Sequence, residues 1–165
     1  MIVRVISGGQ TGVDQAALRV AASLRIAIGG WCPPGRVSND GRIPDSFPLT
    51  ETPHDRSADA PDIPRLQRTE WNVRDSDGTL LLCLGPLEHA DAGTRWTAAC
   101  AANQGKPIFV ADPADLLDAR RVREWIGAHG IEILNVAGPS EQTCSGIGDL
   151  AETFMREVLA PQPGG

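Results

Sequence analysis

Short apolar runs alternate along the chain with longer segments in which apolar residues recur at helical spacing. The apolar runs, rich in β-branched residues, predict strands at residues 2–6, 25–28, 79–84, 107–110 and 132–136. Helical spacing and capping residues predict helices at residues 13–24, 63–75, from 93, from 113 to 130 and at 147–159. Strands that alternate with helices indicate an α/β fold, doubly wound around a mainly parallel sheet.

The chain length of 165 residues suits a single domain, which we place at residues 1–160, with a frayed tail at 161–165. Residues 31–61 break the alternation, because they are rich in Pro and Gly and carry little periodicity. A long irregular segment in a small domain is usually functional or disordered. Its aromatic residues Trp31 and Phe47 favour an ordered lid over a linker.

Composition removes several classes of function. The net charge of −6 and the lack of Tyr argue against a nucleic-acid-binding surface. The four cysteines have no C-x-x-C or zinc spacing, and we expect reduced thiols in a cytoplasmic protein. The three histidines show no metal-ligand spacing, so we predict no metal site. No signal peptide or long apolar span is present, so we expect no membrane association.

The first candidate site is the turn between the first strand and the first helix, residues 7–12. A glycine-rich turn before a helix directs backbone N–H groups at an anion and tolerates close approach. Its spacing is neither that of a dinucleotide fingerprint nor that of a P-loop, and a plain tight turn is the alternative. Asp14 would repel an anion, so it could instead hold the loop, a ribose hydroxyl or a cation. The candidate contacts are Gly8, Gly9, Gln10, Thr11, Gly12 and Asp14.

Two more loops follow apolar strands and precede helices, at residues 85–94 and 137–148. In doubly wound sheets ligands bind at the carboxyl ends of strands, so we expect these loops to meet the first one. Gly93 and Thr94 would begin a second helix at the site, and Gly138 would allow close approach in the third loop. Ser140 and Thr143 add small polar neighbours there.

Weaker candidates lie outside these turns. Arg36 on the long loop could clamp an anionic group, although a solvated loop charge is equally consistent with the sequence. Asn72, Asp75 and Asp77 surround the end of a predicted helix, where carboxylates oppose the helix dipole. Carboxylates at this unfavourable position would indicate a functional role, whereas a turn that ends the helix is the simpler interpretation.

Four stretches together resemble the putative molybdenum carrier family, within the Rossmann-like group that includes the lysine-decarboxylase-like and Lonely Guy proteins. The stretches are residues 7–14, 30–36 with 40–44, 68–79 and 134–139, and the resemblance extends over residues 2–159. It implies a Rossmann-like fold that binds a phosphate-bearing ligand, which for molybdenum cofactor carriers is the pterin-phosphate cofactor (molybdopterin) or molybdate. It also implies a homo-oligomer. A nucleotide is the alternative ligand.

The hydrolase branch of that group makes a second hypothesis. Lonely Guy phosphoribohydrolases carry Pro-Gly-Gly-x-Gly-Thr-x-x-Glu, in which the Glu serves catalysis. The matching residues here keep Gly93 and Thr94 but have Thr97 in place of the Glu. A hydroxyl cannot replace a carboxylate as acid or base at neutral pH, so we expect a binding protein and assign no catalytic residue. A nucleotide-sensing domain without turnover is the third hypothesis.

Overall fold

A computed structural model of the chain, which describes residues 1–161, has a five-stranded parallel sheet. The predicted Rossmann-like α/β fold is therefore confirmed. The strands follow the order β2 (Ala27–Gly29), β1 (Arg4–Ile6), β9 (Ile133–Ala137), β7 (Gly78–Leu82) and β8 (Ile108–Ala111). The last four residues, which belong to the predicted tail, lie outside the described part. No helix in the described residues is long and apolar enough to cross a membrane.

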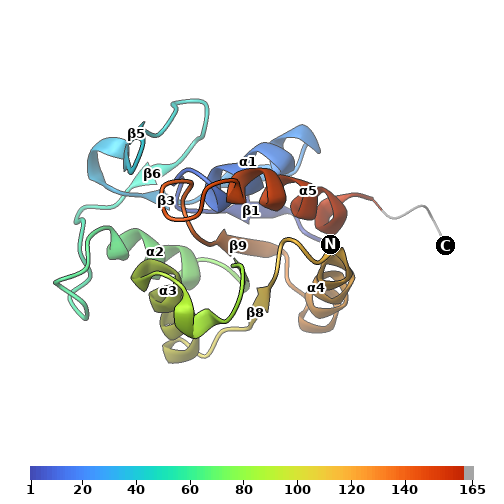
Figure 1. Cartoon of the computed structure of the whole chain (residues 1–165). Coiled ribbons are helices and arrows are strands. Elements are labelled where there is room, and N and C mark those ends of the chain that lie inside the picture. Colours follow the sequence, from blue (N-terminus) through green and yellow to red (C-terminus); the bar gives the residue numbers. More distant parts are fainter. Residues whose placement is uncertain (162–165) are drawn as a thin grey trace.

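Helices cover both faces of the sheet (Figure 1). On one face α1 (Val13–Ser23) packs against α5 (Ile147–Leu159), which in turn contacts α4 (Leu116–His129). On the other face α2 (Leu66–Arg74) packs against α3 (Ala92–Asn103). The two helical layers bury strand β7 on both faces, which is why its sequence is almost continuously apolar.

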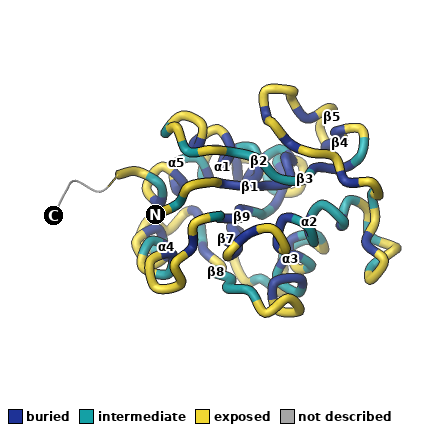
Figure 2. The backbone as a smooth tube through the Cα atoms, turned by 180° about the vertical axis from the view of Figure 1, so that it is seen from behind, coloured by how far each residue is buried: buried dark blue, intermediate teal, exposed yellow. Residues whose placement is uncertain are grey.

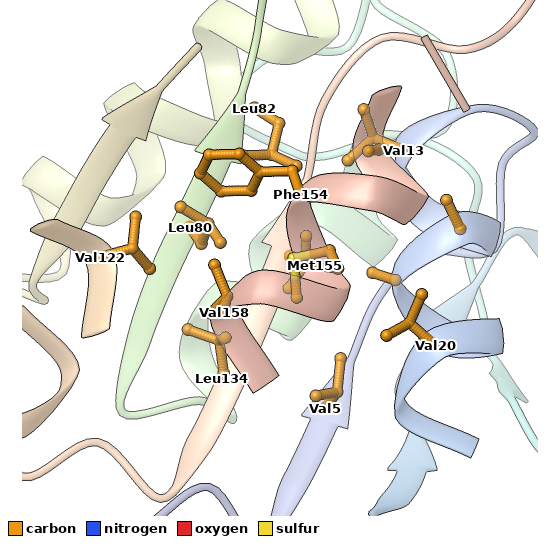
Figure 3. Close-up of a cluster of buried hydrophobic side chains, with 14 of the residues drawn as sticks. Val5, Val13, Val20, Leu80, Leu82, Val122, Leu134, Phe154, Met155 and Val158 are labelled. Atoms are coloured by element: carbon orange, nitrogen blue, oxygen red, sulfur yellow. The ribbon is translucent and has the colours of Figure 1, made fainter. Parts of the chain in front are cut away.

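The main core lies between the sheet and α5 (Figure 3). Phe154 and Met155 of α5 are fully buried, together with Leu80, Leu82 and Leu134 of the central strands. Each such side chain contributes roughly 1.5–3 kcal/mol relative to an exposed one. The strongly amphipathic sequence of α5 thus fixes which face of the helix meets the sheet.

The opposite layer is built from smaller residues. Val73, Cys100 and Ala101 form its buried cluster between α2, α3 and the sheet. Burial, helped by the nearby Glu70 and Asp59 carboxylates, raises the pKa of the Cys100 thiol to about 12. Cys100 is therefore an unreactive core residue at neutral pH, as its alanine-rich surroundings predict.

Two predicted helix starts are wrong by three residues. α2 begins at Leu66 rather than at residue 63, after Arg65 in the left-handed region at φ 63°. α4 begins at Leu116, where the Asp115 carboxylate accepts a hydrogen bond from the Leu117 N–H at 2.9 Å. In both cases the Pro-containing segment forms a turn first. The predicted end of α4 is confirmed, since Gly130 closes it at φ 60°.

The long segment after β2 is ordered, as predicted. Strand β3 (Trp31–Cys32) pairs with β6 (Thr50–Glu51), and β4 (Val37–Ser38) forms a hairpin with β5 (Gly41–Arg42). A short 3₁₀ turn, η1 (Pro34–Arg36), precedes the hairpin. A buried cluster attaches the segment to α1 and consists of Leu18, Cys32, Ile43, Phe47 and Leu49. In Figure 2 the hairpin lies at the end of the molecule opposite to the C-terminus.

The strand order brings the three candidate loops together. Strands β1, β9 and β7 are neighbours, and each is followed directly by one of these loops. The chain proceeds from β1 outward to β2, but from β7 outward in the other direction to β8. The reversal leaves a crevice at the carboxyl ends of the central strands, where ligands bind in folds of this type.

Candidate ligand-binding cleft

A cleft of about 330 Å³ lies at this reversal point. Four segments that are far apart in the sequence line it, namely the β1–α1 turn, the start of α2 with the residues before it, the start of α3, and the β9–α5 loop. The tip of the β4–β5 hairpin adds Asn39. The volume of the cleft is at the lower end of the ~300–1,000 Å³ that is typical of small-molecule sites.

Asp14 and Arg68 form an ion pair inside the cleft. The Arg68 Nη1 atom lies 3.1 Å from the Asp14 Oδ2 atom, which also accepts a hydrogen bond from the Gln10 backbone N–H at 3.2 Å. Asp14 is 1% exposed. Burial raises the pKa of the Asp14 carboxyl group, and the charge of Arg68 opposes this rise. Asp14 thus holds the first turn to α2, one of the roles that the sequence left open.

Asp91 occupies the N-terminus of α3. Its carboxylate accepts hydrogen bonds from the Thr94 backbone N–H at 3.1 Å and from the Thr94 hydroxyl at 2.7 Å. The donors that we predicted for an external anion are therefore engaged by a carboxylate of the chain itself. An anion would have to displace Asp91 to reach Thr94, because both occupy the same end of the helix dipole.

Asn39 connects the hairpin to the cleft walls. Its backbone N–H donates to the Gln10 side-chain oxygen at 3.2 Å, and its side-chain amide donates to the Ser140 hydroxyl at 3.1 Å. Its side-chain oxygen accepts a hydrogen bond from Arg65. The Gln10 amide also donates to the Val37 carbonyl at 3.1 Å. Hydrogen bonds of Asn39 and Val37 thus hold the hairpin against one side of the cleft.

Two arginines and two aspartates line the cleft, namely Arg65, Arg68, Asp14 and Asp91. Their formal charges cancel. The two arginines differ, because Arg68 is paired with a buried carboxylate whereas Arg65 donates to a neutral amide. Arg65 therefore keeps its charge uncompensated, which makes it the stronger attractor for an incoming anion.

Of the predicted site residues, five line the cleft: Gln10, Asp14, Gly93, Thr94 and Gly138. The remaining residues of the first turn serve packing. A Cβ on Gly8 would overlap the Arg68 guanidinium, one on Gly9 would lie 2.6 Å from Leu49 Cδ1, and one on Gly12 would lie 2.6 Å from the Pro139 carbonyl. The Thr11 hydroxyl hydrogen-bonds to the Asp40 carboxylate. These glycines permit close approach of chain segments, which the sequence alone does not distinguish from close approach of a ligand.

Arg36 does not line the cleft. Its guanidinium group donates to four backbone carbonyls of its own loop, those of Ile43, Pro44, Phe47 and Leu49, at 2.8–3.3 Å. The side chain is 10% exposed. We expected Arg36 to face an anion, but here it holds the long loop together, because a planar fork with five N–H donors satisfies several carbonyls at once.

The residues around the end of α2 lie outside the cleft as well. Asn72 holds β3, since its side chain accepts from the Trp31 N–H at 2.8 Å and donates to the Trp31 carbonyl at 2.9 Å. Asp75 accepts from the Trp31 indole N–H at 2.7 Å. Asp77 accepts from the backbone N–H groups of Glu132 and Ile133 at the opposite edge of the sheet. The helix-stop interpretation of these residues thus fits the structure.

Sequence reasoning missed Arg65, Arg68, Asn39 and Asp91. Arg68 stands at the start of one of the stretches that carry the family resemblance, which was the available signal. Ser140 and Thr143, which we named as polar neighbours, do line the cleft. In residues 1–161 no group of three His, Cys, Asp or Glu side chains could hold a metal ion.

Comparisons with known proteins agree with this architecture. The family described as "Circularly permutated YpsA SLOG family" matches residues 5–159. A crystal structure titled as a putative molybdenum carrier protein from Syntrophus aciditrophicus is similar over 96% of both chains, with 36% sequence identity and a TM-score of 0.86. A search among curated proteins found no match.

Proposed function

The chain belongs to the circularly permutated YpsA SLOG family, and we propose that it is a binding protein for a small phosphate-bearing ligand or oxyanion. Within that class we propose the molybdenum cofactor, molybdopterin, or molybdate as the ligand. The likeness to a crystal structure of a putative molybdenum carrier protein and the family resemblance of the sequence support this choice.

The position of Arg65 and Arg68 is the observation that carries the proposal. Arg65 directly precedes α2, and Arg68 lies in the first turn of this helix. Both residues line the cleft at the carboxyl ends of the strands. Guanidinium groups bind phosphate and other oxyanions through paired N–H donors. The hydroxyl groups of Ser140 and Thr143 line the same cleft and offer neutral donors.

The cleft also suits the uncharged part of such a ligand. Ile63, Pro64 and Leu66 give it an apolar wall beside the arginines. Trp31 is not among the residues that line the cleft, and it packs edge-on against Trp71 with ring centroids 4.7 Å apart. Recognition by the anionic group, with the ring against aliphatic side chains, therefore fits the cleft better than aromatic stacking.

A hydrolase is the second candidate, and the positions of the polar groups disfavour it. Thr97 stands where related hydrolases have their Glu, and its hydroxyl donates to the Gly93 carbonyl at 3.0 Å. The carboxylates of Asp14 and Asp91 are held by Arg68 and Thr94, respectively. A catalytic acid or base has to be available to the substrate, and these carboxylates are already engaged by partners within the chain.

Anion titrations of arginine variants test the proposal. We expect Arg65→Gln and Arg68→Gln each to weaken binding of molybdate and of adenosine monophosphate about tenfold or more, the effect of losing a charged hydrogen bond. Arg120→Gln, on the exposed face of α4, is the matched control, because it removes one guanidinium group far from the cleft. Unchanged affinity in both cleft variants would contradict the proposal.

The identity of the ligand needs a separate measurement. Native mass spectrometry of freshly purified protein, together with elemental analysis for molybdenum, distinguishes a pterin cofactor from a nucleotide by mass and metal content. The homo-oligomer that the resemblance implies stays a prediction, which light scattering on the same sample would test.

A further inference from the structure

The buried carboxylate of Asp14 has its ionic partner on the accessible wall of the cleft. Its side chain is 2% exposed, whereas that of Arg68 is 17% exposed. A ligand in the cleft can therefore contact Arg68 while Asp14 has little access to water. Any negative charge that Arg68 binds competes with Asp14 for the same guanidinium group.

Such competition changes the proton affinity of Asp14. Burial raises the pKa of its carboxyl group, and Arg68 is the largest influence that lowers it. When an anion shares the guanidinium, Asp14 loses part of this support and acquires a like charge nearby. Both effects favour the neutral carboxyl form, since two negative charges in a site of low dielectric constant do not both persist.

We propose that each anion bound at Arg68 is accompanied by one proton taken up from solvent by the Asp14 carboxylate. This inference rests on the proposed function, because it concerns the same cleft. The neutral carboxyl group leaves two arginines and one other aspartate, Asp91, around the ligand. The cleft thus gains a net positive charge at the moment when an anion enters.

The other charged groups near the cleft have neutral or backbone partners. From α2, Arg65 donates to Asn39, and from the start of α3, Asp91 accepts from Thr94. From the hairpin, Asp40 accepts from the Thr11 hydroxyl, and from the β9–α5 loop, Glu141 accepts from the Gly146 and Gly148 N–H groups. Neither His nor Lys lines the cleft in the described residues. Asp14 is therefore the group whose charge is most closely coupled to occupancy of Arg68.

Proton uptake by Asp14 makes the anion affinity depend on pH. The pKa of Asp14 is higher in the anion-bound protein than in the free protein, so between these two pKa values binding brings a proton with it. In this window anion affinity rises as the pH falls, by up to about tenfold per pH unit. Above and below the window Asp14 keeps the same protonation state on binding, so it gives the anion affinity no pH dependence. The bound anion is therefore released more readily as the pH rises through the window.

Calorimetry of the wild-type chain tests this coupling. We would titrate sulfate in PIPES and in Tris at the same pH. Unlike phosphate, sulfate does not change its protonation state near neutral pH. The two buffers differ in ionisation enthalpy, so the difference in observed binding heat counts the protons taken up. Inside the window we expect close to one proton per sulfate, and at several pH values an affinity that rises as the pH falls.

Two variants assign the proton. Asp14→Asn keeps the shape but cannot titrate, so we expect no proton uptake and tighter, pH-independent sulfate binding near neutral pH. Asp118→Asn is the control, since it removes a carboxylate paired with Arg121 on α4, and it should behave as the wild type. Should Asp14→Asn not fold, the wild-type proton count still tests the coupling, because sulfate binding without proton uptake overturns it.

Each remaining outcome is informative. Sulfate binding by the wild type without proton uptake at any pH in the series overturns the inference but leaves the proposed function standing. Proton uptake that persists in Asp14→Asn places the proton on another group and also overturns it. If neither sulfate nor molybdate binds the wild type, the inference and the proposed function fail together.

Discussion

Gly12 lies where the first turn meets the β9–α5 loop. It adopts φ +83°, and a Cβ there would lie 2.6 Å from the Pro139 carbonyl oxygen and 2.9 Å from the Glu141 nitrogen. The Val13 N–H donates to that same carbonyl at 3.3 Å. A single residue without a side chain thus allows the two loops that form one wall of the cleft to meet.

Gly12→Ala should therefore destabilise the domain more than an equivalent change elsewhere. Gly130 is a matched control, because it also has positive φ, +60°, but open space around its Cβ position. We expect Gly130→Ala to cost about 1–2 kcal/mol through backbone strain alone. Gly12→Ala should cost about 1–3 kcal/mol more, because backbone atoms have to move and because Gly12, at ψ −125°, lies outside the left-handed region that Gly130 occupies. Urea denaturation measures both, and equal losses would show that the loops adjust freely.

The long segment between β2 and α2 is organised from within. Arg36 binds four carbonyls of residues 43–49, and the buried cluster around Ile43 and Phe47 attaches the segment to α1. These contacts hold the β4–β5 hairpin, whose tip reaches the cleft through Asn39. An irregular segment without a long strand or helix thus becomes a rigid element, because one arginine satisfies backbone groups that would otherwise be buried unpaired.

Removing this arginine should loosen the segment specifically. We expect Arg36→Gln to lower the free energy of unfolding by about 2–4 kcal/mol, since hydrogen bonds to a charged group are among the stronger ones. Hydrogen exchange should accelerate in residues 36–50 first. Arg42→Gln is the control, because Arg42 pairs with Asp45 on the surface and should contribute less than about 1 kcal/mol. Equal effects of the two changes would mean that the segment is held by its apolar cluster alone.

At the scale of the whole molecule, the cleft exists only because the sheet brings distant segments together. Gln10, Asn39, Arg68, Thr94 and Ser140 line one cavity although they span most of the chain. The same assembly determines which polar groups can react. Within the cleft, Asp14 pairs with Arg68 and Asp91 accepts a hydrogen bond from Thr94. Thr97 donates to a backbone carbonyl.

We therefore expect no appreciable release of free base from nucleoside monophosphates. The assay compares the wild type with Asp14→Asn and follows the base chromatographically, alongside a binding titration of the same ligand. Binding without turnover is the expected result. Robust turnover by the wild type would contradict the carrier proposal, and its loss in Asp14→Asn would identify Asp14 as the catalytic group.

The amino-acid sequence was sufficient to predict the architecture. Apolar runs that alternate with amphipathic helices specify a parallel sheet between two helical layers, because each element has to bury its apolar face. The motif around residues 7–14 located the first wall of the cleft. Helix starts were less accurate, since a Pro-containing turn before α2 or α4 has the same local composition as a first helical turn.

The partners of individual side chains became apparent only from the tertiary structure. Local sequence does not reveal which partner a long charged side chain will meet, and so Arg36 was assigned to the ligand while Arg68 was overlooked. Likewise, a glycine that admits another chain segment has the same sequence signature as one that admits a phosphate, as Gly9 and Gly12 show. These distinctions depend on contacts between residues separated by tens of positions, which strand order and packing alone establish.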